Sequence, residues 1–256
     1  MRGVAILTEQ RSGSNWLGSL TNATGLMGHS EEWLLGSENL RFEPSSYVAF
    51  EEAVIRKGST DNGRFAIKIF PRHLESCKNK FGKDFLFEIN RKHDLLVILL
   101  ERRDRLRQAI SAYRANMSGV FTSQNHERTT LRTVPYSFSG ISQAYFQIEL
   151  SYAYWRSYVN LLGLDHRIFV YEDLQPDPTL YLEAFAEFME VPAPESTPAS
   201  KFMIQRDSVT EEWLARFRED VAAKGAIEGI GNTPVSRTLG NLVRFLLKRP
   251  LDRKRF

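Results

Sequence analysis

The strongest structural signal in the chain lies in residues 4–16, which read VAILTEQRSGSNW. The apolar run Val4–Thr8 enters a turn rich in serine and glycine, a pattern typical of a buried strand that ends in a loop. Trp16, Leu17 and Leu20 then follow at helical spacing. We therefore predict a strand, a loop and a helix. In an open α/β sheet, ligands bind at this carboxyl end of a strand.

Three further apolar runs predict strands at Phe65–Phe70, Leu95–Leu100 and Arg167–Tyr171. Leu95–Leu100 contains no polar residue, which suits the centre of a parallel sheet. Helices are predicted at 104–117, 142–162, 178–189 and 210–223. Residues 118–140 show no clear periodicity and are predicted to form a long loop. Strands that alternate with helices indicate an α/β fold, with a mainly parallel central sheet flanked by helices, in one domain over residues 1–256.

The charge balance excludes a basic face over the whole domain. The chain has 256 residues, with 34 Lys and Arg against 31 Asp and Glu, a net charge of +3. Residues 248–256 contain five cations and one anion, so this tail carries +4 and the rest of the chain −1. A nucleic-acid binding domain needs basic residues over its folded surface, so we expect no nucleic-acid partner. The tail is interpreted as a solvated terminus or as a weak contact with a membrane surface.

Cysteine content and hydropathy predict a cytoplasmic protein, with peripheral contact to the inner face of the membrane as an open alternative. Cys77 is the single cysteine, which excludes an intrachain disulfide and makes a cysteine-based metal site unexpected. No window reaches the roughly 20 apolar residues that a membrane-spanning helix needs. The run Val4–Leu7 is too short for a secretory signal.

The loop at residues 10–16 has the composition of an anion site. A helix start offers unpaired N–H groups and a positive dipole end, and Gly13 lets a ligand approach the backbone. The side-chain donors are Arg11, Ser12, Ser14 and Asn15. Gly13 and Gly18 have the spacing of a nucleotide P-loop, but Ser19 stands where that motif requires lysine. A Ser/Gly turn that only caps the helix is an equal alternative from this segment alone.

A second junction between strand and helix is dense in arginine, since residues 101–111 read ERRDRLRQAIS. Arg102 is the first cation past the strand end, and such an arginine is suited to grip a second phosphate. Ser111 lies about two and a half helical turns further on. We expect Arg105 and Arg107 to face water on a solvated side of the helix.

Two motifs, taken together, are specific. The first comprises residues 10–17 (QRSGSNWL) and 24–33 (TGLMGHSEEW), and the second, residues 101–115, contains the pattern R-x-D-x-x-x-Q-A-x-S-x-x-R-A. Residues 171–174 (YEDL) and 211–217 (EEWLARF) add weaker similarity. With these motifs the chain resembles the bacterial trehalose 2-sulfotransferase family, which includes relatives assigned to lipopolysaccharide or Nod-factor sulfation.

The resemblance implies a P-loop-like α/β fold and transfer of a sulfuryl group from 3′-phosphoadenosine 5′-phosphosulfate (PAPS), which leaves adenosine 3′,5′-bisphosphate. It assigns the 5′-phosphosulfate to a loop formed by Arg11, Ser12, Gly13, Ser14, Asn15 and Trp16. Arg102 and Ser111 match the family's ligands of the 3′-phosphate, and Glu32 matches its general base. Arg11 can also stabilise charge on the leaving phosphate. The family usually has threonine where Asn15 stands.

Three side chains compete as the base that takes the proton of the acceptor hydroxyl. Glu32 holds the family position, and its neighbour Glu31 has the lesser weight. His73 has the better intrinsic pKa for work at neutral pH, but we favour a surface helix start for it. Two roles are equally open for Lys68. Its positive charge could point toward the cofactor, or it could form an ion pair with an aspartate or glutamate.

The acceptor side is predicted in outline. The resemblance implies a carbohydrate or glycolipid hydroxyl, and a homodimer is an open alternative because some relatives dimerise. His29, Glu31 and Trp33 are candidate acceptor contacts. Residues 33–50 and 118–140 are the expected walls, since binding residues concentrate on irregular segments.

Two other functions are open at this point. A P-loop kinase would need Mg²⁺ and would use Ser19 in place of lysine. A non-catalytic carbohydrate- or anion-binding protein would use the aromatic residues of the helix at 142–162 as a stacking surface. We favour core packing for that helix, because positions 148, 152, 155 and 159 share one face.

Overall fold

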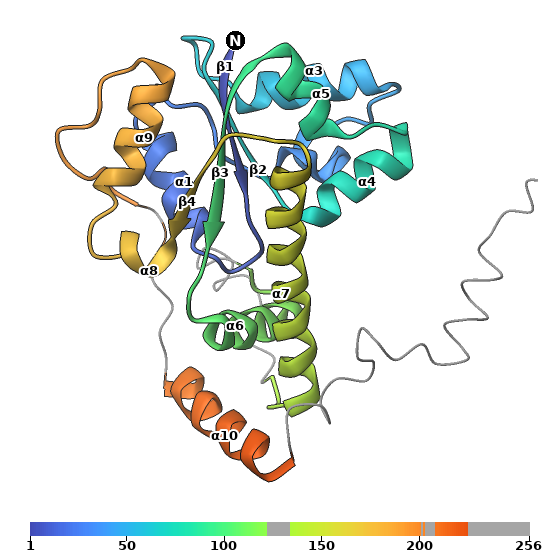
Figure 1. Cartoon of the computed structure of the whole chain (residues 1–256), viewed down its shortest axis with the longest axis vertical. Helices are drawn as coiled ribbons and strands as arrows, with labels where there is room; N and C mark the ends of the chain where they lie inside the picture. The colour runs from blue at the N-terminus through green and yellow to red at the C-terminus, as the bar shows by residue number, and fades with distance from the viewer. Residues whose placement is uncertain (122–133, 201, 203–207, 225–256) are drawn as a thin grey trace, which may run out of the picture.

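Four parallel strands form the centre of the computed structural model, which describes residues 1–121, 134–200, 202 and 208–224 (Figure 1). The strands are β1 (Arg2–Leu7), β2 (Phe65–Ile69), β3 (Asp94–Glu101) and β4 (His166–Val170). Their order in the sheet is β2-β1-β3-β4. Leu7 pairs with both Ile69 and Leu99, so the carboxyl ends of the three neighbouring strands lie level. The mainly parallel α/β sheet predicted from the sequence is confirmed.

Helices surround the sheet on both faces. They are α1 (Ser14–Ala23), the 3-10 helix η1 (Trp33–Leu35), α2 (Ser37–Leu40), α3 (Tyr47–Gly58), α4 (Pro71–Phe81), α5 (Phe85–Lys92), α6 (Arg105–Ser118), α7 (Phe138–Leu161), α8 (Tyr171–Leu174), α9 (Thr179–Met189) and α10 (Ser208–Lys224). The five helices predicted from the sequence correspond to α1, α6, α7, α9 and α10. At the ends of the expected loop at 118–140, α6 runs to Ser118 and α7 begins at Phe138.

The helices α3, α4 and α5 were missed in the sequence, although each carries a start signal. Ser46 and Asp84 accept hydrogen bonds from the third residue beyond them, at the starts of α3 and α5. Pro71, interpreted as the end of a strand, is also the first residue of α4, where the absence of an N–H costs nothing. These helices form much of the wall on one side of the sheet.

The apolar strand β1 is buried on both faces because successive side chains point to opposite sides. Val4 and Ile6 pack in a cluster with residues of α1 and α9, whereas Ala5 and Leu7 pack with α3, α4, α5 and α7. Figure 1 shows these two groups of helices on opposite sides of the sheet. A strand with helices on both faces of its sheet needs apolar side chains at successive positions. This explains the continuous apolar run at the start of the chain.

The long helix α7 joins this core to a third cluster, in which it packs with α6 and α10 beyond the carboxyl ends of the strands (Figure 1). Ile148, Tyr152, Trp155 and Val159 are buried, so the preference for core packing is confirmed. The Trp155 indole donates a hydrogen bond of 2.9 Å to the carbonyl oxygen of Thr8, just past the end of β1. α7 therefore supports the edge of the sheet at which ligands bind.

In the described part of the chain, no helix has the length and hydropathy to span a bilayer. The basic tail at 248–256 lies outside the described residues, as do residues 122–133 of the expected loop.

Replacing Trp155 with alanine is expected to lower the free energy of unfolding by about 3–5 kcal/mol, because a buried indole and the hydrogen bond to Thr8 are both lost. Leu161→Ala at the exposed end of the same helix should change it by no more than about 0.5 kcal/mol. Urea denaturation followed by circular dichroism measures both values. Similar losses in the two variants would contradict the role assigned to Trp155.

Candidate active site

The loop after β1 contains two unusual backbone conformations. Gly13, at the start of α1, has φ 91°, and Arg11 has φ 61°. A Cβ atom on Gly13 would lie 2.2 Å from the Tyr171 ring, so both the conformation and the space require glycine. No side-chain hydrogen bond caps α1, which disfavours the alternative of a simple capping turn.

Several donors of this loop have no acceptor within the described residues. The N–H groups of residues 13–16 donate to no protein atom there, as the first turn of a helix leaves them. The hydroxyl oxygen of Ser12 is buried and has no hydrogen-bond partner among the described residues. Unpaired buried donors cost free energy, and an anion at the helix start would satisfy them.

Three arginines bring positive charge to this loop. The Arg11 Nε donates to the hydroxyl of Ser111 at 2.8 Å, and Arg102 donates to the backbone oxygen of Arg11 at 2.9 Å. Burial, followed by the positive charges of Arg102 and Arg114, lowers the pKa of Arg11. Burial likewise lowers the pKa of Arg102. The structure thus brings Arg11, Arg102 and Ser111 together, and the mutual repulsion of the arginines favours a ligand with several negative charges.

Arg114 and Gln108 were missed as site residues, although both stand in the second motif. Ser111 and Arg114 are three residues apart on α6 and so share a helix face, a spacing that marks Arg114 as a neighbour of the site. Gln108 is fully buried and donates to the backbone oxygen of Gln10 at 2.8 Å. It therefore holds the loop from the helix below.

The short helix α8 braces both loops. The carboxylate of Glu172 accepts hydrogen bonds from the backbone N–H groups of Arg103 at 2.7 Å and Asp104 at 3.1 Å. The guanidinium of Arg102 lies 5.1 Å from the centre of the Tyr171 ring, and that same ring fills the space beside Gly13. The weak motif at residues 171–174 is thus the support of the anion loop and of Arg102.

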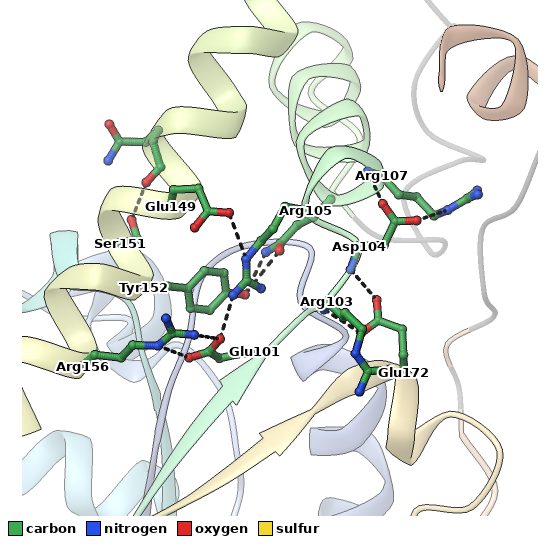
Figure 2. A network of polar contacts seen from close by, with 12 residues as sticks. Glu101, Arg103, Asp104, Arg105, Arg107, Glu149, Ser151, Tyr152, Arg156 and Glu172 are labelled. Carbon is green, nitrogen blue, oxygen red and sulfur yellow. Dashed lines mark hydrogen bonds and ion pairs between the residues drawn. The ribbon is translucent and has the colours of Figure 1, made fainter. Parts of the chain in front are cut away.

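Arg105 is turned inward, so the expectation that it faces water was wrong, whereas Arg107 lies at the surface and pairs there with carboxylates. Figure 2 shows Arg105 directed toward Glu101 and Tyr152, with Glu149 on its other side. Its guanidinium lies 2.7 Å from a Glu101 oxygen and 3.9 Å from the centre of the Tyr152 ring. Arg107 forms ion pairs with Asp104 and Glu211. The physical reason is that α6 packs between α7 and α10, so that its charged side chains meet carboxylates of its neighbours.

The candidate base Glu32 lies beside a buried lysine. The Lys68 side chain is 1% exposed, and its ammonium nitrogen lies 3.1 Å from Glu32 Oε1. Lys68 also donates to the side-chain oxygen of Asn15 in the anion loop. Arg72 approaches the other carboxylate oxygen of Glu32 at 3.9 Å. Lys68 therefore forms the ion pair with a carboxylate that was one of its two expected roles. This ion pair lies next to the loop at residues 10–16.

His73 is buried, so the expected surface position was wrong. The start of α4 folds back on β2, and the His73 ring stacks on Phe70 with centroids 4.9 Å apart. Its Nδ1 accepts a hydrogen bond of 3.2 Å from the Phe70 N–H, so the neutral ring carries its proton on Nε2. Nε2 lies 3.9 Å from Glu32 Oε2. Burial, together with Arg72 and Lys68, lowers the pKa of His73 to about 3.

The remaining predicted residues surround these groups. The Trp33 indole donates to the backbone oxygen of His29 at 2.7 Å, and the backbone N–H of Lys68 donates to the backbone oxygen of Glu31 at 3.1 Å. Residues 29–33 therefore run along β2 and place Glu32 beside its strand. Trp16 packs edge-on against Tyr171, with ring centroids 5.9 Å apart. No group of three or more His, Cys, Asp and Glu side chains suited to a metal ion occurs in the described ranges.

The fold and the site define a P-loop-like α/β protein, in which a strand, a Ser/Gly loop and a helix form an anion site at the edge of a parallel sheet. A sequence profile of the Stf0 sulphotransferases matches residues 4–220. The chain belongs to this family, the trehalose 2-sulfotransferase family, and is a sulfotransferase.

One solved structure similar to this chain is a sulfotransferase from Alicyclobacillus acidocaldarius. The two sequences are 15% identical, the match covers 88% of this chain and 94% of the other, and the TM-score is 0.47. No curated protein matches the sequence.

Replacing Gly13 with alanine is expected to destabilise the protein more than Gly163→Ala does. Both glycines have positive φ, of 91° and 59°, and that strain costs about 1–2 kcal/mol for an alanine. A Cβ at Gly163 meets nothing within 4 Å, whereas at Gly13 it meets Tyr171. Overpacking should add about 1–3 kcal/mol at Gly13 alone. Equal losses in urea denaturation would contradict the packing of Tyr171 on the loop.

Proposed function

We propose that this sulfotransferase moves a sulfuryl group from PAPS to a hydroxyl group of a carbohydrate or glycolipid, with Glu32 as the general base. The observation that carries the proposal is the position of Lys68, which contacts both Asn15 in the anion loop and the carboxylate of Glu32. A base and an anion site that share one buried cation are close enough to act on the same reacting group.

The residues present fit PAPS, which supplies the activated sulfuryl group and two separate phosphate positions. The helix-start N–H groups and the Ser12 hydroxyl are suited to the 5′-phosphosulfate, together with Arg11, Gly13, Ser14, Asn15 and Trp16. Arg102 and Ser111 are suited to the 3′-phosphate. The Nε of Arg102 is buried and makes no hydrogen bond among the described residues, and its nearest ion pair is Glu172 at 3.5 Å. A phosphate would supply the missing acceptor.

The proposed step breaks the S–O bond to the 5′-phosphate while a bond forms between sulfur and the acceptor oxygen. The acceptor proton moves to the Glu32 carboxylate, and the electron pair of the broken bond stays on the phosphate. The step needs positioning and charge stabilisation more than covalent participation of the protein, as in phosphoryl transfer. Arg11 and Lys68 place positive charge where negative charge develops.

His73 is less suited than Glu32 to act as the base. Its Nδ1 is engaged by the Phe70 N–H, and its Nε2 already carries a proton in the neutral ring. The low pKa also means that His73 resists taking up a second proton at any pH above about 3. The His73 Nε2 lies 3.9 Å from Glu32 Oε2, beyond hydrogen-bond range, and has no hydrogen-bond partner among the described residues.

The structure disfavours the kinase alternative, because the lysine that a nucleotide P-loop requires is absent. Ser19, at the lysine position of the nucleotide P-loop, donates to the backbone oxygen of Trp16 at 2.7 Å and contacts Ser200. It therefore faces its own helix and brings no charge to a β- or γ-phosphate.

A single domain over residues 1–256, the cytoplasmic location, a homodimer and membrane contact through the tail stay predictions. The acceptor contacts His29, Glu31 and Trp33 also stay predictions, as do the two walls expected at residues 33–50 and 118–140.

Replacing Arg102 with alanine should weaken the binding of adenosine 3′,5′-bisphosphate about 10- to 100-fold, because a charge-assisted hydrogen bond contributes about 1.5–3 kcal/mol. Isothermal titration calorimetry measures the affinity. Arg103→Ala is the matched control, since the Arg103 side chain is 63% exposed and pairs with Asp173. Unchanged affinity in Arg102→Ala would remove Arg102 from the phosphate site.

Glu32→Gln should keep bisphosphate affinity and lose about 10²- to 10⁴-fold in kcat, the usual contribution of a general base. His73→Gln should retain most of the rate, because Nε2 makes no hydrogen bond to Glu32 and the glutamine keeps a polar side chain at this position. Its pH–rate profile between pH 5 and 9 should keep the wild-type shape, since a group with a pKa of about 3 does not titrate there. A dead His73→Gln beside an active Glu32→Gln would make the histidine the base.

A further inference from the structure

Arg11 is held in an unfavourable backbone conformation by two side chains from outside the loop. Its φ of 61° lies in the left-handed region, which costs free energy for any residue with a Cβ atom. Such a conformation persists only where the surrounding contacts fix it. Gln108 donates to the backbone oxygen of Gln10 at 2.8 Å, and Arg102 donates to that of Arg11 at 2.9 Å. The carbonyl groups on both sides of Arg11 are therefore held by side chains.

This conformation sets the direction of the Arg11 side chain. Its Nε reaches the Ser111 hydroxyl at 2.8 Å. Its guanidinium lies close enough to Arg102 for that positive charge to lower the pKa of Arg11, in addition to the larger effect of burial. An Arg11 side chain turned elsewhere would leave the cluster that suits a ligand with several negative charges. The affinity for such a ligand therefore depends on the fraction of molecules in which the loop has this shape.

The amide of Gln108 is in turn held by Tyr152. Gln108 is fully buried, and Tyr152 is 2% exposed. The Tyr152 hydroxyl oxygen lies 3.0 Å from Nε2 of the amide and 3.3 Å from its Oε1. An amide nitrogen has two N–H donors, so one can serve Gln10 and the other Tyr152. Removing the hydroxyl would take the acceptor from a buried N–H group and weaken the constraint on the amide.

An ion-pair network holds the ring of Tyr152 (Figure 2). The Arg105 guanidinium lies 3.9 Å from the ring centre, and it pairs with Glu101 at 2.7 Å and Glu149 at 3.3 Å. Glu101 is the last residue of β3, and it also pairs with Arg156 at 2.6 Å. Burial raises the pKa of the Tyr152 hydroxyl, so this group stays neutral and can both donate and accept. Polar contacts thus run without a break from the end of β3 to the loop after β1.

We propose that Tyr152 is a positioning residue for the sulfuryl donor, and that its hydroxyl acts through Gln108 to keep Arg11 in the left-handed conformation. The proposal rests on the proposed function, because it takes PAPS as the donor. Tyr152 lies on α7, outside the motifs on which the family resemblance rests, and it acts only through its neighbours. Glu101 and Arg105 belong to the same arrangement, because they fix the ring that carries the hydroxyl.

Tyr152→Phe removes the hydroxyl and keeps the ring. It should raise the Kd for adenosine 3′,5′-bisphosphate about 3- to 10-fold in calorimetry, the usual effect of losing one neutral hydrogen bond. Tyr158→Phe is the matched control, since it removes a hydroxyl of the same helix that donates to Asp84 at 2.8 Å. Both variants should lower the thermal midpoint by about 2–4 °C, but the control should keep wild-type affinity. A lower midpoint with unchanged affinity in Tyr152→Phe would overturn the proposal.

A double-mutant cycle shows whether Tyr152 acts through Gln108. Gln108→Met keeps the length of the side chain and removes the amide, so it should itself weaken bisphosphate binding. In that background, Tyr152→Phe should change the Kd less than about twofold, because the hydroxyl has no amide left to hold. A loss as large as in the wild-type background would mean that Tyr152 affects the loop by packing alone, contrary to the proposal.

Hydrogen exchange without ligand separates this proposal from the proposed function. In NMR spectra of isotopically labelled protein, the side-chain N–H groups of Gln108 should exchange about tenfold faster in Tyr152→Phe than in the wild type and Tyr158→Phe. A wild-type protein that binds no bisphosphate but shows this exchange pattern refutes PAPS as the donor, while the hold of Tyr152 on the loop stands. Normal bisphosphate binding, with equal exchange in all three proteins, refutes the role of Tyr152 alone.

Discussion

The buried ammonium group of Lys68 is the constraint on which the rest of the site depends. A charge removed from water is tolerated only with close polar partners, and Lys68 finds them in Glu32 and Asn15. Lys68 pairs with Ile6 of β1 in the sheet, so its backbone position is set by strand register. One side chain thus ties a loop that follows β1 and a carboxylate that follows α1 to the same point on the sheet.

On the side of the loop that faces α6 and α8, positive charges lie next to one another, in contrast to the paired charges of Lys68 and Glu32. Arg11 donates there to the Ser111 hydroxyl, and Arg102 donates to the backbone oxygen of Arg11 and lies over the Tyr171 ring. Glu172, 3.5 Å from Arg102, is the carboxylate that pairs with the cluster. Mutual repulsion and burial make such a cluster costly in the absence of an anion. Binding a polyanion relieves that cost, so ligand should stabilise this protein against unfolding by linkage. The near-neutral charge of the chain outside its tail conceals this local concentration.

The sequence predicted the parts of the site that follow one another along the chain, and it missed those that depend on contacts between distant segments. The loop at residues 10–16 and Arg102 were identifiable because each follows an apolar strand. The orientation of Arg105 was not, because it depends on Glu149 and Tyr152 of α7, which packs beside α6. The burial of His73 was not either, because α4 folds back toward Glu32, a residue distant in sequence. Tyr171 was visible only as part of a weak motif, since its ring acts through space on Gly13.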